Sequence, residues 1–401
     1  MLRKIVLIIL GITLYLSLRL PNISTRMTYH LDQGLHILDT YKMVTDKKIR
    51  LIGPMAITQN FQERYFFIGP QYYYILAILG TIFAWNPLAI TIFLIFFDLI
   101  VLLIFCHWLF QKYSMKLAIL FFLLFTLGPY FIAHARFFWQ PHFILPLDFL
   151  SISTLLMGNY FIFGILWGLA FSFHYTAILW GLNLIIFLFL FKKIINIKQI
   201  FLILIGFLIG DLPYFIFELR NNFYNIRTII LIFTHGSTTT RFAPHYLVYP
   251  LIPLFIFIII RFYKKILPVS LAISFLILVQ YLFTDRSLPY GHPPNWNYVD
   301  ELKVVNLITK DSCPKDFNIA STLDSDTRAL DIRSLLTVKK CPPMSVTDYP
   351  VSKTLFLVSP ATRDPLSDTV WEISVFRPFK IVRQVRINDK LNFYELKRIE
   401  K

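Results

Sequence analysis

The most informative feature of this sequence is how little charge it carries. Only 15% of its 401 residues are charged, against roughly 25% in an average soluble domain. With 14 glycines and 22 prolines, the chain also lacks the composition of collagen-like or low-complexity proteins. Its three cysteines are too few for a disulfide scaffold and lack the paired spacing of a zinc site. A soluble globular protein, a disordered chain and a disulfide-stapled domain are therefore all disfavoured.

Acidic residues are especially scarce in the first part of the chain. Residues 1–283 contain 21 Lys and Arg against 8 Asp and Glu, whereas residues 284–401 contain 18 against 15. The net charge of +16 therefore comes mostly from the more hydrophobic part. This distribution is typical of a membrane protein with basic loops, so membrane lipids are expected partners and nucleic acid is not.

Long apolar runs are abundant, and they predict membrane spans. Hydrophobic residues make up 56% of the chain, and the mean hydropathy is +0.62. We interpret nine runs as spans: 5–20, 88–110, 116–133, 142–157, 160–174, 175–191, 199–217, 246–262 and 266–283. The first run follows Arg3 and Lys4 like a signal peptide but has no small-residue cleavage site, so we expect an uncleaved span.

Positive charges at the ends of these runs predict the orientation, because cytoplasmic loops collect Lys and Arg. Four groups without an acidic residue lie there: Arg3/Lys4, Lys112/Lys116, Lys192/Lys193/Lys198 and Arg261/Lys264/Lys265. All four are cytoplasmic only if the amino terminus is cytoplasmic and the short apolar stretch 71–85 does not cross. We therefore expect 71–85 to be a re-entrant or interfacial segment on the outer face, with side chains in the headgroup region from Tyr72, Tyr73, Tyr74 and Trp85.

Residues 284–401 have the composition of a soluble domain. Helical patterns cover 297–311 and 327–338, and strand patterns cover 317–322, 354–359, 371–376, 381–387 and 392–399. We expect a helical multi-pass membrane bundle over 1–283, with an outer loop at 21–87, and a small extracytoplasmic α/β domain over 284–401.

Two of the three cysteines, Cys313 and Cys341, fall in this C-terminal region. An extracytoplasmic location permits a disulfide between them, but two free thiols are also compatible with the sequence. Cys106 lies in a predicted span, where we interpret it as a packing residue.

Acidic, basic and imidazole side chains gather on the predicted outer face. If residues 31–40 form a helix, Asp32, His36 and Asp39 share one face. That spacing could hold a divalent cation or place a base beside its orienting group, although a solvated amphipathic helix would show the same pattern. The sequence identifies no cofactor beyond this candidate cation.

Arginines on the same face could clamp a phosphate, because the guanidinium fork matches phosphate oxygens. The candidates are Arg136, Arg220 and Arg241, with Arg136 the first choice because it precedes Trp139-Gln140-Pro141 at the mouth of two spans. They could equally anchor loops to lipid headgroups. His174, which ends an apolar run, could be a ligand or simply a packed histidine.

This layout resembles the membrane-embedded type C glycosyltransferases that use polyprenyl-phosphate sugars, in particular the branch of protein O-mannosyltransferases and the lipid A aminoarabinose transferase. The matching pieces occur in the family's order between about 30 and 255: Asp32-Gln33-Gly34, Leu51-Ile52-Gly53-Pro54, Gly69-Pro70-Gln71-Tyr72-Tyr73-Tyr74, Arg136 with Trp139-Gln140-Pro141, Gly168-Leu169-Ala170 leading to His174, Glu218-Leu219-Arg220 with Asn222-Phe223, and His245-Tyr246-Leu247-Val248-Tyr249-Pro250-Leu251-Ile252-Pro253.

The resemblance implies inverting transfer of a sugar from a polyprenyl-phosphate carrier to an outer-face lipid, glycan or protein acceptor. It implies Asp32 as the catalytic carboxylate. The substrate-binding residues would be Arg136, His174, Glu218, Arg220, Arg241, His245 and Tyr246. Two other interpretations remain: a transporter or flippase of lipid-linked sugars, and a non-catalytic scaffold of the cell envelope.

Overall fold

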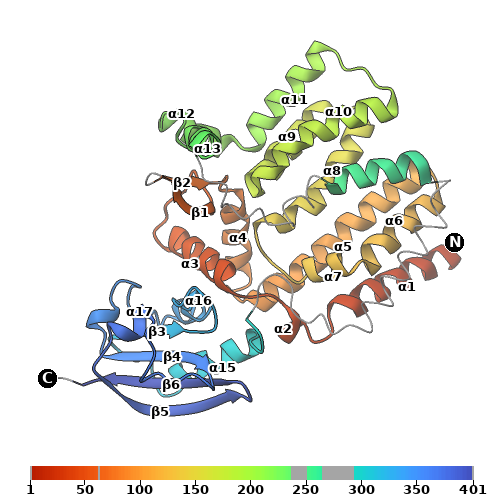
Figure 1. Cartoon of the computed structure of the whole chain (residues 1–401). Helices are drawn as coiled ribbons and strands as arrows, with labels where there is room; N and C mark the ends of the chain where they lie inside the picture. Colours follow the sequence, from red (N-terminus) through yellow and green to blue (C-terminus); the bar gives the residue numbers. More distant parts are fainter. Residues whose placement is uncertain (1, 62–63, 236–250, 264–292, 400–401) are drawn as a thin grey trace.

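The computed structural model describes residues 2–61, 64–235, 251–263 and 293–399. Most of it is helical, and a small sheet lies at the C-terminal end (Figure 1). The bundle contains α1 (Leu2–Arg19), α5 (Pro87–Lys112), α6 (Met115–Leu127), α7 (Pro129–His134), α8 (Ile144–Leu156), α9 (Tyr160–Phe173), α10 (Trp180–Phe191), α11 (Ile197–Gly210), α12 (Leu212–Arg220), α13 (Tyr224–His235) and the helix Leu251–Tyr263, with 3-10 turns at Gln140–Phe143 and Tyr175–Leu179.

Phenylalanine side chains fill much of the centre of the bundle. Phe105 of α5 stacks on Phe149 of α8 with ring centroids 4.9 Å apart, and Phe121 of α6 packs edge-on against Phe105. All three are at most 3% exposed. Cys106 is buried beside them and unpaired, as expected of a packing residue.

Helices α9 and α11 make the closest helix contact in the bundle because glycines face each other across it. A Cβ atom added at Gly164 would lie 2.3 Å from the carbonyl oxygen of Ile203, and one at Gly168 would lie 2.2 Å from that of Phe207. Gly206 and Gly210 show the same crowding from the other side. Two Gly-x-x-x-Gly pairs therefore bring the two backbones into contact, the packing that membrane helices often use.

In the structure, several helices are shorter than the predicted spans, and two of the predicted spans are broken within their length. Among the described helices, α5 is the single one that is both long and apolar enough to cross a membrane. The predicted span 116–133 is divided at Gly128, because Pro129 starts the separate helix α7. The predicted span 199–217 is bent by 79° between α11 and α12, where Pro213 begins a new helix. Most of 246–262 is described as helix, whereas 266–283 lies outside the described residues.

The chain between α1 and α5 combines helices with a hairpin. It contains α2 (Ile23–Arg26), α3 (Leu31–Thr45), the antiparallel hairpin of β1 (Met55–Phe61) and β2 (Arg64–Phe67), and α4 (Gln71–Ile82). Tyr72 and Tyr73 of α4 are each only 2% exposed, and Trp85 packs against Tyr41. The prediction that these three side chains lie among lipid headgroups was wrong, because they belong to the protein core.

The C-terminal residues form a four-stranded sheet with two helices against it. The strand order is β3-β4-β6-β5, with β3 parallel to β4 and the other pairs antiparallel. The elements are α15 (Tyr298–Thr309), β3 (Phe317–Ser321), α16 (Leu330–Val338), β4 (Thr354–Pro360), α17 (Trp371–Ser374), β5 (Phe379–Asn388) and β6 (Leu391–Arg398), with a 3-10 turn at Tyr349–Val351. This α/β unit matches the predicted helices and four of the five predicted strands.

The fifth predicted strand, 371–376, was wrong. Residues 371–374 form the short helix α17, and a turn follows at 375–376. Ile373 in the helix and Phe376 in the turn are buried, while Trp371 is 51% exposed. Apolar residues three apart fit one face of a helix, so burial at 373 and 376 favoured the helical turn over alternation. Cys313 and Cys341, which the sequence left open as a pair or as free thiols, form a disulfide.

The outer helix α3 packs between the bundle and the α/β unit (Figure 1). A single hydrophobic core joins Ile37 of α3, Tyr72 of α4, Val304 of α15 and Ile332 of α16. The boundary predicted between 1–283 and 284–401 stays a prediction, because residues 264–292 lie outside the described part of the chain.

Candidate functional site

The candidate site is built on α3, whose start is set by local side-chain chemistry. The backbone N–H of His30 donates a hydrogen bond to Gln33 Oε1 at 3.0 Å, which closes the first turn. Asp32 lies in that turn, where the positive end of the helix dipole favours a carboxylate. The side chain of Asp32 is exposed, whereas Gln33, Gly34 and His36 are buried. Asp32 is therefore available to a substrate from a well-anchored helix.

A cavity of about 700 Å³ opens beside this helix. Its walls come from α3, the segment 50–53, the β1–β2 hairpin, α4 and the end of α12. The lining residues are Leu35, Asp39, Arg50, Leu51, Ile52, Gly53, Met55, Phe67, Tyr73, Phe217, Arg220 and Asn221. The cavity is thus mainly apolar with a few charged groups, the composition expected of a small-molecule site.

Asp39, Arg50 and Tyr73 form a connected polar group on one wall of the cavity. Arg50 Nη2 lies 3.1 Å from Asp39 Oδ1, and the Tyr73 hydroxyl donates to Asp39 Oδ2 at 2.9 Å. The Arg50 guanidinium also lies 5.6 Å from the centre of the Tyr73 ring. The Tyr74 hydroxyl donates to the backbone carbonyl of Arg50. Because Asp39 already accepts two charge-assisted or phenolic hydrogen bonds, it fits an orienting role better than that of a free base.

Arg220 contributes a second cation to the cavity from the end of α12. Its side chain is exposed, and no ion pair joins it to a carboxylate within the described residues. Nearby Glu218 is 1% exposed and accepts hydrogen bonds from the backbone N–H groups of Asn225 and Ile226, both at 3.1 Å. Glu218 therefore caps the start of α13 and holds the turn that presents Arg220, while its predicted role in substrate binding stays a prediction.

His36 lies on the same face of α3 as Asp32 and Asp39. Its ring is 3% exposed and packs edge-on against Tyr72, with centroids 5.1 Å apart. Burial lowers the pKa of His36, although the negative charges of Asp32 and Asp39 partly oppose this shift. A neutral imidazole therefore separates the two carboxylates, which are about 10 Å apart along the helix axis.

No group of three His, Cys, Asp or Glu side chains in the described part of the chain is placed to hold a metal ion. The predicted set Asp32, His36 and Asp39 shares a helix face, but His36 points into a tyrosine cluster and Asp39 is bound to Arg50. These residues do not fit a common cation, so the spacing alone was misleading.

Arg136 and His174 are held by the protein itself. Arg136 is 5% exposed, and its Nε and Nη2 donate to the backbone carbonyls of Arg19 and Leu18 at 3.0 and 2.7 Å. It ties the end of α1 to the loop before α8, so these contacts support a structural role. His174 Nδ1 accepts from the backbone N–H of Thr176 at 3.3 Å and caps a 3-10 turn. Their roles in substrate binding stay predictions without a supporting contact.

Three more predicted residues, Arg241, His245 and Tyr246, lie outside the described residues. Conversely, Arg50 and Tyr73 line the cavity but were not chosen as site residues. Arg50 directly precedes the Leu51-Ile52-Gly53-Pro54 segment, and Tyr73 belongs to the tyrosine triplet of the Gly69-Pro70 segment. Both residues therefore lie in or next to segments that resemble the family, and this was a signal in the sequence. Nothing in the sequence indicated that their side chains contact Asp39.

No protein-family model and no curated protein matches this chain. Solved structures do resemble it. ArnT from Cupriavidus metallidurans bound to undecaprenyl phosphate matches with a TM-score of 0.55 and 12% identity over 97% of each chain. The apo state of the same protein matches with a TM-score of 0.57 and 13% identity over 98% of each chain. At this identity the likeness shows that the chain shares the fold of ArnT, which agrees with the helical bundle and small C-terminal α/β unit expected from the sequence.

Proposed function

We propose that this protein is a multi-pass membrane glycosyltransferase that transfers a sugar from a polyprenyl-phosphate carrier. The observation that carries the proposal is the cavity of about 700 Å³ beside α3, which combines apolar walls with the cations Arg50 and Arg220. A lipid-linked phosphate needs both surfaces. The fold likeness to ArnT, one of whose structures holds undecaprenyl phosphate, supports the same donor class.

Asp32 is the proposed general base. In an inverting transfer, the acceptor hydroxyl oxygen forms a bond to the anomeric carbon while the bond from that carbon to the phosphate oxygen breaks. The hydroxyl proton passes to the Asp32 carboxylate, and the electron pair of the broken bond leaves with the phosphate. An exposed carboxylate fits this task because both the acceptor and its proton must reach it.

Arg220 is the proposed receiver of the charge that develops on the leaving phosphate. Within the described part of the chain Arg220 has no carboxylate partner, and such a guanidinium can accept this charge without first breaking an ion pair. Arg50 fits a different task, since its charge is already shared with Asp39. We assign Asp39, Arg50 and Tyr73 to shaping the cavity wall and orienting the donor.

The proposed setting is the cell membrane, with a cytoplasmic amino terminus and the site on the outer face. The acceptor would be an outer-face lipid, glycan or protein. A flippase of lipid-linked sugars would bind the same donor but return it intact, and an envelope scaffold would leave it unchanged.

The test is donor consumption by the purified full chain in lipid nanodiscs, offered a panel of polyprenyl-phosphate sugars with candidate acceptors. We expect release of polyprenyl phosphate from at least one donor, and a product whose anomeric configuration, read by NMR, is inverted. Arg220→Ala should slow this release, while Lys340→Ala, on the α/β unit, serves as a matched loss of surface charge. Binding of donors without release of polyprenyl phosphate would contradict the proposal and favour the flippase.

A further inference from the structure

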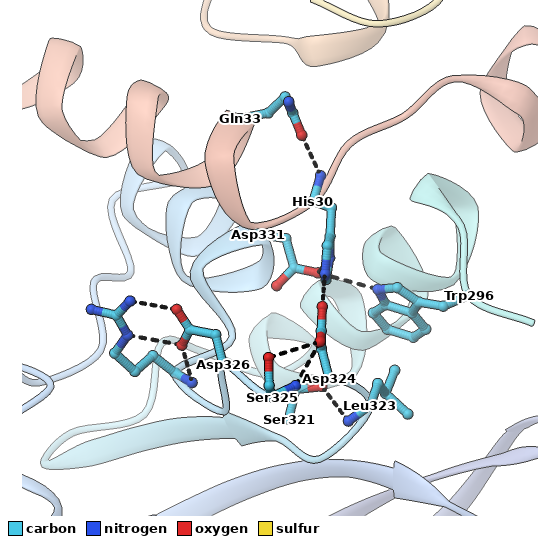
Figure 2. A network of polar contacts seen from close by, with 10 residues as sticks. His30, Gln33, Trp296, Ser321, Leu323, Asp324, Ser325, Asp326 and Asp331 are labelled. Carbon is cyan, nitrogen blue, oxygen red and sulfur yellow. Dashed lines mark hydrogen bonds and ion pairs between the residues drawn. The ribbon is translucent and has the colours of Figure 1, made fainter. Parts of the chain in front are cut away.

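A second polar network lies at the start of α3, where the helix meets the α/β unit. His30, the residue before α3, has Nε2 3.0 Å from Asp324 Oδ2 and Nδ1 3.7 Å from Asp331 Oδ2. Asp324 follows β3, and Asp331 lies in the first turn of α16. Figure 2 shows the His30 side chain directed from the start of α3 toward these two carboxylates. One imidazole therefore joins the start of α3 to two segments of the α/β unit, the nearer of which is 294 residues away in sequence.

The network is largely screened from water. The side chains of His30 and Asp331 are 14% and 4% exposed, whereas Asp324 is 32% exposed. Trp296 Nε1 donates to the second partner, Asp331 Oδ2, at 3.1 Å, which fixes that carboxylate. Glu301 of α15 lies behind it, fully buried.

The charges of these groups favour a protonated His30. Burial alone would lower the pKa of His30, but Asp331 and Asp324 outweigh this effect and raise it from the ordinary 6.5. Burial would likewise raise the pKa of Asp331, yet the bond and charge of His30 lower it. Burial, reinforced by Asp331, raises the pKa of Glu301 well above its usual range, which disfavours a further negative charge beside Asp331. One imidazolium thus faces two carboxylates.

The backbones of α3 and α16 are in direct contact here. A Cβ atom at Gly34 would lie 2.4 Å from the carbonyl oxygen of Leu330 and 2.6 Å from the backbone nitrogen of Asp331. The Tyr29 hydroxyl is hydrogen-bonded to Ser334 one turn further along α16. The first turns of α3 therefore pack directly on the backbone of α16. The side chains of His30 and Tyr29, just before α3, add polar contacts to Asp331 and Ser334 of α16.

We infer that His30 is a positioning residue: held by Asp324 and Asp331 of the α/β unit, it fixes the first turn of α3 and thereby the direction in which Asp32 presents its carboxylate. The catalytic part of this inference rests on the proposed function. Asp32 is two residues from His30 in the same turn, so a rotation of that turn moves its carboxylate directly. The α/β unit is, on this view, part of the catalytic scaffold.

The sign of the pH dependence follows from the raised pKa of His30. The imidazolium contact is fully present below the ordinary pKa and is lost as pH rises through the raised one. Asp324, Asp331 and Glu301 are the acidic groups that face this contact from the α/β unit, and Asp32 is the nearest on α3 itself. Replacing Asp324 removes one of the two charges that raise the pKa of His30, so the contact should then fail at a lower pH.

The experiment compares Asp324→Asn with Asp326→Asn in the full chain. Asp326 lies on the same loop but pairs with Arg328, whose Nε is 2.8 Å away, and it serves as the matched control. Two readouts are measured between pH 6 and 9, the pH range being set by the ordinary histidine pKa. One is hydrogen exchange over residues 34–37, where the Gly34 N–H donates to His30 O at 2.9 Å. The other is kcat and KM for donor turnover.

For Asp324→Asn we expect faster exchange over residues 34–37 and a kcat lowered roughly tenfold at an unchanged KM, because misplacing a catalytic group by about 1 Å can cost up to a hundredfold. The decrease of kcat with rising pH should begin at a lower pH in this variant than in the wild type. Asp326→Asn should match the wild type in both readouts. His30→Lys, which keeps a positive charge that does not titrate in this range, should flatten the decrease of kcat with rising pH.

Unchanged exchange in Asp324→Asn would overturn the inference whatever the activity. Faster exchange with an unchanged kcat and pH profile would also overturn it, since His30 would then be a structural contact alone. Faster exchange in a protein whose wild type consumes no donor would contradict the proposed function while upholding the role of His30 in fixing α3.

Discussion

Helix α3 is held at two places by a cation and a carboxylate, but in opposite surroundings. At the N-terminal end, His30 lies between Asp324 and Asp331, and Gly34 touches the backbone of α16. Two turns further along the helix, Asp39 pairs with Arg50 and faces a cavity of about 700 Å³. The fastened end, which is the first turn of α3, is held against protein and carries the exposed Asp32. The open end, which is the part around Asp39, lines the cavity, whose lining residues do not include Asp32.

The difference between the two cations determines how each end responds to pH. A guanidinium stays charged throughout the physiological range, whereas an imidazolium loses its proton near neutrality. A rise in pH should therefore loosen the fastened end and leave the Asp39–Arg50 pair intact. Mutations can weaken the contact at one end and leave the other intact, which tests whether the two ends act independently.

The largest expected effect is that of Asp32→Asn, at the fastened end. Loss of a general base typically lowers kcat about a hundredfold to ten-thousandfold, while the amide keeps the size of the side chain. Donor turnover measures this, with thermal unfolding as a check of folding. Asp39→Asn should cost less, because Asp39 orients Arg50 and Tyr73. Asp46→Asn, at the C-cap of α3, is the control. Equal, small losses for Asp32→Asn and Asp39→Asn would remove Asp32 as the base.

The next effect concerns the open end and distinguishes two arginines. Arg220→Ala should lower kcat on the order of a hundredfold, as expected for the loss of one group that stabilises transition-state charge. Arg220→Lys should recover only part of this, because an ammonium cannot replace the guanidinium fork. Arg136→Lys should instead lower the melting temperature and spare kcat, since Arg136 binds backbone carbonyls. A kcat loss for Arg136→Lys without destabilisation would return the phosphate role to Arg136.

A smaller effect is expected from removing the disulfide on the α16 side of the fastened end. Cys341 closely follows α16 and is bonded to Cys313 across 28 residues. Replacing both by Ser should lower the free energy of unfolding by about 2–4 kcal/mol. Hydrogen exchange should rise in α16 and in the first turns of α3, with no change in residues 39–45. A uniform rise along the whole of α3 would mean that its two ends are not independent.

The smallest effect is that of Gly34→Ala. The added methyl group would overlap the backbone of Leu330, and overpacking of this kind costs about 1–3 kcal/mol. Gly181→Ala is the matched control, because its Cβ would meet only the side chain of Trp167, at 3.2 Å. Thermal unfolding of the two variants provides the measurement. Equal melting temperatures would show that α16 can move away from α3 at no cost.

The C-terminal unit could be predicted from sequence because its signals are local. Asn297 accepts hydrogen bonds from the N–H groups of Val299 and Asp300 and starts α15 where the pattern placed a helix. Leu355, Leu357 and the other buried positions of β4 follow from its apolar run. In this unit the predicted secondary structure failed only at 371–376, because the apolar residues there fit both an alternating strand pattern and one face of a helix.

The candidate site was less predictable because its members meet through tertiary contacts. Asp39, Arg50, Tyr73 and Arg220 come from four separate segments, and no spacing rule connects them. The phosphate role was assigned first to Arg136 from its position near a span. In the structure, the Arg136 side chain donates hydrogen bonds to backbone carbonyls at the end of α1. Helix termini leave such carbonyls without partners, and only the fold reveals which arginine satisfies them.

The glycine contact between α9 and α11 has a mechanical consequence. Two helices whose backbones touch at four glycines cannot slide or rotate independently without collision. Any reorientation of α12 must therefore take place at Asp211, where the chain already turns by 79°. Arg220 sits at the far end of the nine-residue helix α12. Arg220 therefore stands at the end of a helix that leaves this rigid pair at a fixed bend, and Glu218 ties that end to the start of α13.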